Sequence, residues 1–280
     1  MSAIQITKED FQLVCPSATM PDDGMIRQIA LYFIEAARVV ASIVSPALML
    51  MAENVTLSEK TTDEDVALGK EIRKFIAVKA YMLALPHLDL VLTATGFGVV
   101  SNQNVAPASA DRVERLRRSL TAQLCECLDN LREMIRHRED LPEKYRWFFR
   151  QSLFWSGEHA RLFGNPDATT EDLTRHRAEI SDGEVNLRHL ISREMFAYLT
   201  DAVANGRETL TEKTCISLCR NFVVACAKRD ESQLLHRNEL IAFLDENIGD
   251  FQVYERSSAY KANHFKPYQN EKDDPCFFFG

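Results

Sequence analysis

Seven cysteines and seven histidines are the side chains best suited to metal or nucleophilic chemistry, and their spacing limits what they can do. Cys215, Cys219 and Cys226 recur at intervals that place them on one face of a helix. A structural zinc site needs four donors, usually supplied as two close pairs. No second pair accompanies this stripe, which also contains Phe222. The pattern favours reduced core thiols, and we expect neither a metal site nor any other cofactor.

Catalytic motifs are missing from the sequence. The histidines form no His-Glu-x-x-His pair, and there is no Gly-x-Ser-x-Gly elbow. The adjacent pair Glu158-His159 follows Gly157 and has no partner nearby in the sequence. Catalytic groups often meet only in the fold, so the sequence does not decide whether the protein is an enzyme, although it favours a protein that is not one.

Two glycine-containing stretches share only part of a phosphate-binding pattern. Gly69-Lys70 has no glycine five residues before Gly69, so it is not a Walker loop. Gly96-Phe97-Gly98 lacks the third glycine of a dinucleotide fingerprint. The glycines of the second stretch are typical of a tight turn.

The formal charge of -8 disfavours nucleic-acid binding, which needs clustered Lys and Arg. The most Arg-rich stretch, 109–150, contains almost as many Asp and Glu and is typical of a solvated helix face. The longest uncharged apolar run, Val39 to Ala52, contains Pro46 and is shorter than the roughly 20 residues of a membrane helix. With free thiols and no export signal, we expect a cytoplasmic protein that does not bind membranes.

The elements that position these residues are predicted mainly from apolar residues at spacings of three and four, the helical period. Helix start signals stand at Thr62, Ser109 and Thr209. Thr209 also forms a capping-box pattern with Glu212 three residues later. The helix that starts at Ser109 is the most regular in the chain.

Three features interrupt the helical pattern. Pro46 predicts a kink or a helix end, and Gly183 predicts an interruption. The segment 90–102 is rich in β-branched residues and glycine. The predicted fold class is therefore all-α, built mainly from long amphipathic helices, with a short β hairpin or strand near 90–102 and a C-terminal arm.

Breaks in the pattern divide the chain into three parts. The clearest break is the turn sequence at 163–167. We predict an N-terminal long-helix unit over 1–160, a C-terminal helical unit over 168–250, and a C-terminal arm over 251–280. The sequence shows no internal repeat.

Aromatic side chains mark two candidate contact regions. Trp147 and Trp155 belong to a predicted helix after residue 141 whose aromatic residues cover most of its circumference. Such a helix must be buried in the core, which is the favoured interpretation, or anchor a partner. Phe277, Phe278 and Phe279 end a polar tail and are expected to add a strand to an exposed edge, in the same subunit or in a neighbour.

The loop between the second long helix and Ser109 is a third candidate contact region. Thr95, Phe97, Val99 and Asn102 interrupt the helices with residues that pack poorly by themselves. A simple connection between two helices is the alternative interpretation.

Three segments carry a family resemblance: Ile6 to Phe11, Thr95 to Asn102 with its continuation Ala106 to Ser109, and Asn270 to Phe279. The specific part is Thr-Gly-Phe-Gly-Val-Val-Ser-Asn with Ala-Pro-Ala-Ser. These segments resemble an uncharacterised family, a domain of unknown function encoded by gut bacteria and their prophages. The family implies no activity. Met25 to Val40 resembles, more weakly, phage head–tail connector proteins, which are small helical adaptors that assemble as rings.

The leading functional hypothesis is a structural or assembly protein, such as a phage or prophage connector component. Its partners would be further copies of itself and other phage structural proteins, and it would then occur in the virion. The alternative is a small-ligand-binding protein, or an enzyme of unknown reaction, with a cleft between helical units. These hypotheses predict different surfaces, an exposed contact element for the first and a pocket of converging polar groups for the second.

Overall fold

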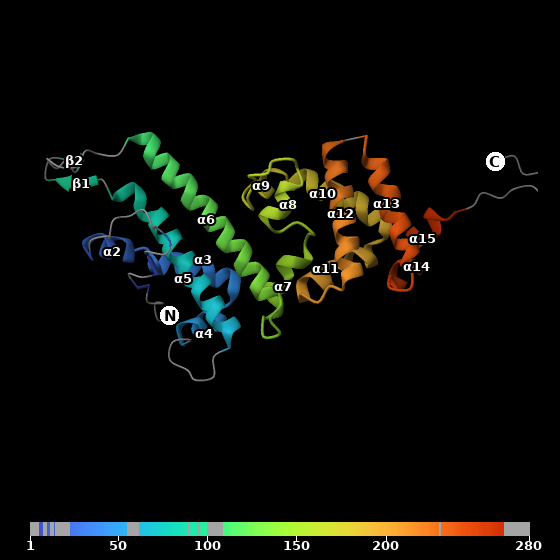
Figure 1. The fold of residues 1–280 in the computed structure, drawn as a ribbon, viewed down its shortest axis with the longest axis horizontal. Helices are drawn as coiled ribbons and strands as arrows, with labels where there is room; N and C mark the ends of the chain where they lie inside the picture. Colours follow the sequence, from blue (N-terminus) through green and yellow to red (C-terminus); the bar gives the residue numbers. More distant parts are fainter. Residues whose placement is uncertain are drawn as a thin grey trace, which may run out of the picture. The chain divides into compact units, whose positions relative to one another are not determined.

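The computed structural model describes residues 6–7, 10–11, 14, 23–54, 62–88, 90–93, 96–99, 109–229 and 231–265. Helices dominate these residues (Figure 1), which confirms the predicted helical fold class. Among the helices described, none has the length and apolarity that a membrane crossing requires. The chain divides into two compact units, unit 1 (Met1–Arg175 with Ala204–Arg207) and unit 2 (His176–Val203 with Glu208–Gly280).

Unit 1 contains most of the helices and one pair of strands. Its elements are α2 (Asp23–Ala30), α3 (Phe33–Val44), α4 (Pro46–Asn54), α5 (Asp63–Ala84), the 3-10 turn η1 (Leu85–His87), β1 (Leu90–Thr93), β2 (Gly96–Val99), α6 (Ala110–Arg136), α7 (Glu143–Arg150), α8 (Gly157–Arg161) and α9 (Asp172–Arg175). The two strands pair antiparallel, with Leu90 opposite Val99 and Thr93 opposite Gly96.

Unit 2 is helical throughout the part that the structure describes. Its elements are α10 (Arg177–Ile191), α11 (Arg193–Asn205, whose last two residues belong to unit 1), α12 (Leu210–Lys228), α13 (Gln233–Glu246), α14 (Gln252–Glu255) and α15 (Ser258–Asn263). α12 packs against α10 and α13, and α15 packs on α10.

Helix α5 forms the centre of unit 1, because α3, α4 and α6 all pack against it. Its start is fixed as predicted. The Thr62 hydroxyl accepts the Asp65 N–H at 3.2 Å, and Asp65 accepts the Thr62 N–H. α5 and α6 run antiparallel, since Asn130 of α6 donates to Glu71 of α5 while the end of α6 lies near the start of α5.

Both units contain a helix, a single serine and a second helix. Ser45 separates α3 from α4, and Ser192 separates α10 from α11. Both serines are buried and have positive φ angles of 83° and 81°, a region that few residues except glycine adopt. The Ser45 hydroxyl accepts the Leu48 N–H at 3.3 Å, and the Ser192 hydroxyl accepts the Met195 N–H at 3.1 Å. Each serine therefore ends one helix and caps the next.

The third helix follows each serine at the same distance along the chain. Ser45 precedes Thr62 by 17 residues, and Ser192 precedes Thr209 by 17 residues. Thr62 and Thr209 both start their helices with a capping box. The helix that begins there, α5 or α12, packs on the helix before the serine.

Burial follows the same register in the two segments. Pairs of positions 147 residues apart that are buried in both units include Val44 and Ile191, Leu48 and Met195, Ile72 and Cys219, Phe75 and Phe222, and Ile76 and Val223. Most of these pairs share apolar character without identity. The two segments therefore share a capped kink, the packing of the third helix on the first and on the fourth, and a common register of burial, although the sequence shows no repeat.

Two expectations about helix boundaries are wrong. Gly183 lies inside α10, where the absence of a side chain lets α12 approach closely. The aromatic helix ends at Arg150, so Trp155 lies beyond it. The predicted arm begins with the two short helices α14 and α15, and the side chains of Phe251 and Tyr254 are buried there.

Candidate functional site

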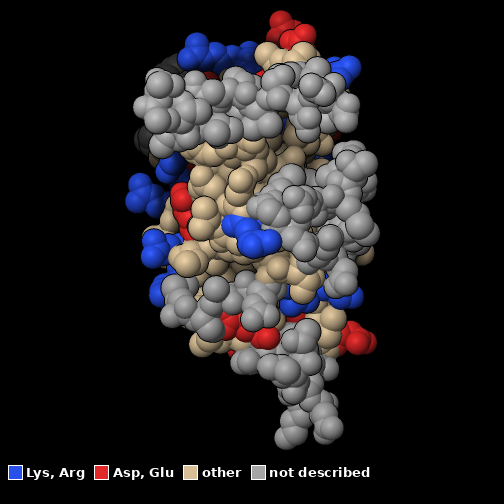
Figure 2. Space-filling view, turned by 90° about the vertical axis from the view of Figure 1, so that its left-hand side faces the viewer, with Lys and Arg blue, Asp and Glu red and all other residues tan. Residues whose placement is uncertain are grey.

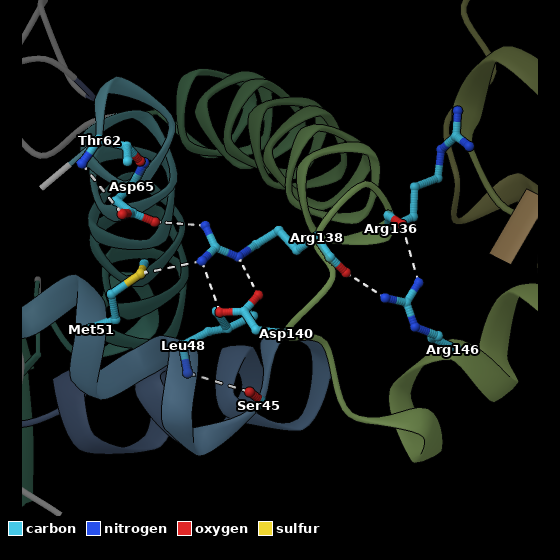
Figure 3. A network of polar contacts seen from close by, with 9 residues as sticks. All are labelled: Ser45, Leu48, Met51, Thr62, Asp65, Arg136, Arg138, Asp140 and Arg146. Carbon is cyan, nitrogen blue, oxygen red and sulfur yellow. Dashed lines mark hydrogen bonds and ion pairs between the residues drawn. The ribbon is translucent and has the colours of Figure 1, made fainter. Parts of the chain in front are cut away.

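Arg138 fixes the C-terminal end of α6 in unit 1 (Figure 3). Its guanidinium donates to Asp65 at the start of α5 at 2.7 Å, to Asp140 at 2.8 and 2.9 Å, and to the Met51 sulfur at 3.7 Å. These hydrogen bonds lower the pKa of Asp65 and of Asp140, and the same bonds raise the pKa of Arg138. The network joins α4, α5 and the residues after α6.

Arg146 of α7 closes the same end of α6 from the other side. Its side chain is 8% exposed and donates to the carbonyls of Arg136 (3.3 Å), Ala204 (2.9 Å) and Arg138. Carbonyls at a helix end have no partner within the helix and need one from elsewhere. Figure 3 shows the Arg146 guanidinium pointing at this end of α6. The prediction that the arginines of 109–150 are solvated is thus wrong for Arg136 and Arg146, which are buried.

An open groove of about 670 Å³ lies between the middle of α6 and the segment 155–169. Asp129 lies in its lining and holds the opposite wall. One carboxylate oxygen accepts the Gly157 N–H at 2.6 Å, and the other accepts the Thr170 hydroxyl. Burial raises the pKa of Asp129, while these two hydrogen bonds oppose that shift. Both oxygens of Asp129 therefore connect α6 to the segment around α8 and α9.

Burial shifts the pKa of two further side chains beside Asp129. Burial raises the pKa of the Cys125 thiol, which makes it a poor nucleophile at neutral pH. Burial lowers the pKa of Arg132 to about 10, so this guanidinium stays charged at neutral pH. Arg132 donates to the Trp155 carbonyl at 2.9 Å and lies 4.3 Å from the Phe148 ring centre. These contacts support the groove wall.

The adjacent residues Glu158 and His159 have different surroundings in the structure. His159 is buried, and its Nδ1 accepts the N–H groups of Trp155 (3.1 Å) and Ser156 (3.3 Å). An Nδ1 that accepts hydrogen bonds carries no proton, so this imidazole is neutral and its Nε2 holds the hydrogen. Glu158 lines the groove instead. His159 acts as a cap for the start of α8.

The groove carries an excess of carboxylates. Glu126, Glu133, Glu158 and Asp167 line it together with Asp129, whereas Arg161 is the one basic residue among the described residues of the lining. Glu133 is bound by Arg136 at 2.7 Å and by His137 at 3.0 Å. The exposed carboxylate of Glu126 makes the groove suited to a cationic occupant.

The start of α6 extends past the end of α5. The contacts between Glu71 and Asn130 and between Asp65 and Arg138 place the last turn of α5 opposite roughly residue 117 of α6. Residues 110–119 are exposed except for the half-buried Leu116. Figure 2 shows basic and acidic side chains at the top of this face of unit 1, where Figure 1 places the start of α6. We call residues 110–118 the α6 overhang.

The predicted contact residues are spread over the structure. Trp147 is 62% exposed, whereas Trp155 is 7% exposed and packs on Phe149 with ring centres 5.4 Å apart. Phe97 and Val99 belong to β2, of which only the backbone is described. Thr95, Asn102, Phe277, Phe278 and Phe279 lie outside the described residues. Among the predicted residues, the structure thus exposes Trp147 and assigns Trp155 to the core.

Sequence reasoning missed Asp129, Arg132 and Arg146. A charged residue on an Arg-rich helix is normally solvated, so composition gave no reason to select them. The one local signal is that Arg132 and Arg136 alternate with the apolar residues Leu131 and Ile135 near the end of α6.

Residues 44–146 match the Family of unknown function (DUF6712). This part of the chain is therefore similar to a DUF6712 domain. The match confirms the expected relationship to an uncharacterised family and brings no activity with it. No curated protein and no solved structure matches the chain, so the likeness to phage connectors has no further support. The DUF6712 region begins beside Ser45, ends at Arg146 and includes both the α6 overhang and the α6 side of the groove.

Proposed function

We propose that the chain is a structural or assembly protein whose DUF6712 region contacts other protein subunits. The observation that carries this proposal is the α6 overhang. About two turns of a long helix are exposed at every residue except the half-buried Leu116, although an isolated helix of this length gains little stability by itself. A protein contact would give these turns the packing partner that the rest of α6 has in α5.

The groove supports this proposal through the roles of its polar residues. Asp129, Arg132 and His159 are engaged in hydrogen bonds that hold the groove wall, and the Cys125 thiol is poorly ionised. A catalytic group needs a pKa matched to its task and a reactive atom free to meet a substrate. These four residues suit a rigid surface better than a reaction.

The finer hypothesis is a connector component of a phage or prophage particle, located in the virion or in the cytoplasm. Its support is the likeness of Met25 to Val40 to head–tail connectors, and α2 and α3 cover most of this segment. Phe97 and Val99 of β2 are proposed contacts because β1, β2 and the α6 overhang belong to one excursion between α5 and the packed part of α6.

The test is the mass of the full chain in solution, measured by light scattering after size exclusion over a wide range of concentration. A dimer, a closed ring or growth with concentration is expected for an assembly protein. A strict monomer at every concentration that also fails to bind particle proteins contradicts the proposal.

The groove itself supports a second candidate function, the binding of a small cation. Its volume is in the usual range for small-molecule sites, and its carboxylates would favour a polyamine or a guanidinium compound. Calorimetric titration with spermidine and with arginine tests this candidate. Saturable binding that Glu126→Gln weakens supports it, and the absence of heat contradicts it.

A further inference from the structure

One face of α6 changes its charge along its length. Residues that line the groove recur at three and four positions from Ser119 to Glu133, so they share one side of the helix. The same side continues into the α6 overhang at Arg112 and Arg115. Both of these side chains are exposed. The face is therefore basic at its N-terminal end and acidic at its C-terminal end, and we call it the α6 strip.

The middle of the α6 strip is small and uncharged. Ser119 and Ala122 are exposed there and line the near end of the groove. Small side chains allow two helix backbones to approach closely, because nothing on either helix holds them apart. Arg115 and Glu126 lie on opposite sides of this midpoint, each about 8 Å from it along the helix axis.

A surface with these properties is complementary to itself. When two identical strips pair antiparallel about a two-fold axis, each position meets its mirror position on the other copy. Arg115 then lies opposite Glu126 of the second copy, and Arg112 lies opposite Asp129. The two-fold axis repeats each of these pairs, so opposite charges meet at both ends of the interface.

Unit 2 supplies independent evidence that the α6 overhang is not needed for the helical core. There, α12 ends at Lys228 and α13 begins at Gln233, so four residues connect the two packed helices. In unit 1 the equivalent connection runs from Ala84 to Ala110 and is followed by the overhang. The third and fourth helices of unit 2 are thus joined by a much shorter connection, so a long excursion is not a requirement for two such helices to pack.

We infer that two copies of this chain associate through antiparallel pairing of their α6 strips, with the overhang of each copy seated in the acidic groove of the other. This inference rests on the proposed assembly function and names its partner as a second copy. The formal charge of -8 makes the copies repel each other in general, so association depends on the local pairing of the basic overhang with the acidic groove.

The test is the dissociation constant of the full-length dimer, measured by sedimentation equilibrium at low salt. Arg115→Glu and Glu126→Arg each place like charges opposite one another at both ends of the interface. Each is expected to raise the dissociation constant by about tenfold or more. The double variant Arg115→Glu/Glu126→Arg exchanges the two charges and is expected to recover most of the affinity of the original chain.

Arg117→Glu is the matched control, because it makes the same charge change in the overhang on the side away from the α6 strip. It is expected to leave the dissociation constant within about threefold. The three substituted positions, 115, 117 and 126, are all exposed, and far-ultraviolet circular dichroism verifies that each variant is folded. Arg115→Glu and Arg117→Glu with equal effects would show a general charge effect and overturn the inference.

Two other outcomes distinguish a failure of the α6 pairing from a failure of the proposed assembly function. An oligomer that is insensitive to both charge reversals overturns the α6 pairing and leaves the assembly function standing. A strict monomer overturns the pairing, and the assembly function then depends on the binding of other particle proteins.

Discussion

The two units use one arrangement of helices but bring different pairs of helices into close contact. In unit 1, Gly69 of α5 faces Ala52 of α4, and a Cβ at Gly69 would lie 3.7 Å from the Ala52 backbone. The equivalent positions in unit 2 are Ile216 and Leu199, both buried and much larger. Close packing between the second and third helices is therefore a property of unit 1, where α4 lies along α5.

Between the first and third helices, the closest approach occurs in unit 2 instead. In unit 2, Gly183 of α10 lies so near α12 that a Cβ there would be 2.8 Å from the Val223 side chain and 2.9 Å from its carbonyl oxygen. The equivalent of Gly183 in unit 1 is Ala36, which is buried. The comparison shows that small residues select which neighbour a helix approaches, while the capped kinks keep the order of the helices the same.

The largest expected effect concerns the clamps that end helices in the two units. Arg146→Met removes the donor to three carbonyls of unit 1, two in buried and one in part-buried hydrogen bonds, and it is expected to lower the free energy of unfolding by about 3 kcal/mol. In unit 2, Asn263 donates to the Leu190 carbonyl at 2.9 Å and to the Tyr254 hydroxyl at 3.1 Å. Asn263→Leu is expected to cost roughly 1–2 kcal/mol, because the lost donor is neutral.

Urea unfolding followed by tryptophan fluorescence measures the unfolding of unit 1 and therefore the effect of Arg146→Met. Both tryptophans of the chain, Trp147 and Trp155, belong to unit 1. Arg175→Met is the control, since Arg175 is an exposed partner of Asp172. Equal losses for Arg146→Met and Arg175→Met would show that Arg146 does not hold the end of α6.

The next effect tests the close contact of α10 with α12. Gly183→Ala forces a Cβ against the Val223 carbonyl and is expected to destabilise unit 2 by about 2 kcal/mol. Gly69→Ala meets only ordinary contacts and gains helix propensity, so it is expected to be neutral or stabilising by up to about 1 kcal/mol. Circular dichroism during urea unfolding, with amide exchange in α10 and α12, measures both. The comparison fails if the two glycines respond alike.

A smaller and matched effect is expected at the two kinks. Ser45→Ala and Ser192→Ala each remove the hydroxyl that caps the following helix and keep the same backbone conformation. Each is expected to cost about 1 kcal/mol, and the two losses should agree within about 0.5 kcal/mol. Thermal unfolding of both variants gives the measurement. A large loss at one kink alone would mean that the two serines are not equivalent.

The smallest effect is a pH dependence that belongs to unit 2. His264 donates to the Tyr260 carbonyl at 2.8 Å and pairs with Asp245 at 3.0 Å, and these contacts raise the pKa of His264. A histidine whose pKa is raised by folding stabilises the protein below its unfolded pKa of about 6.5, and this stability disappears as the pH rises through the folded pKa. His264→Gln should therefore lose more stability at pH 5 than at pH 8, as measured by urea unfolding. Equal losses at the two pH values contradict this role.

Local signals predicted the start of several helices correctly. Thr62 and Thr209 start α5 and α12 with capping boxes, and Pro46 marks a break between helices. These signals involve residues three or four apart, so a single sequence contains all of the information they need. The prediction at Gly183 was wrong because a glycine can either end a helix or allow a neighbouring helix to pack closely. Which of the two occurs depends on the packing partner, which the sequence does not reveal.

The candidate site could be predicted only in part. The regular helix from Ser109 was evident, whereas the role of Asp129 depends on Gly157 and Thr170, which lie 28 and 41 residues away. The helical periodicity that places the residues of the α6 strip on one face can be seen in the sequence. The exposure of that face to solvent cannot. Its overhang exists because α5 ends before α6 does, and that follows from how the two helices align.

The sequence alone was enough to predict that this protein is helical, where its main helices begin, and that part of it resembles an uncharacterised family. These features rest on local periodicity, capping and short sequence patterns. Only the tertiary structure revealed that the two units share a kinked helix pair and its packing on a third helix, that Arg136 and Arg146 are buried, and that a groove opens beside α6. Each depends on contacts between residues far apart in the chain, because burial, helix approach and the pairing of buried charges are set by packing partners rather than by neighbours in sequence.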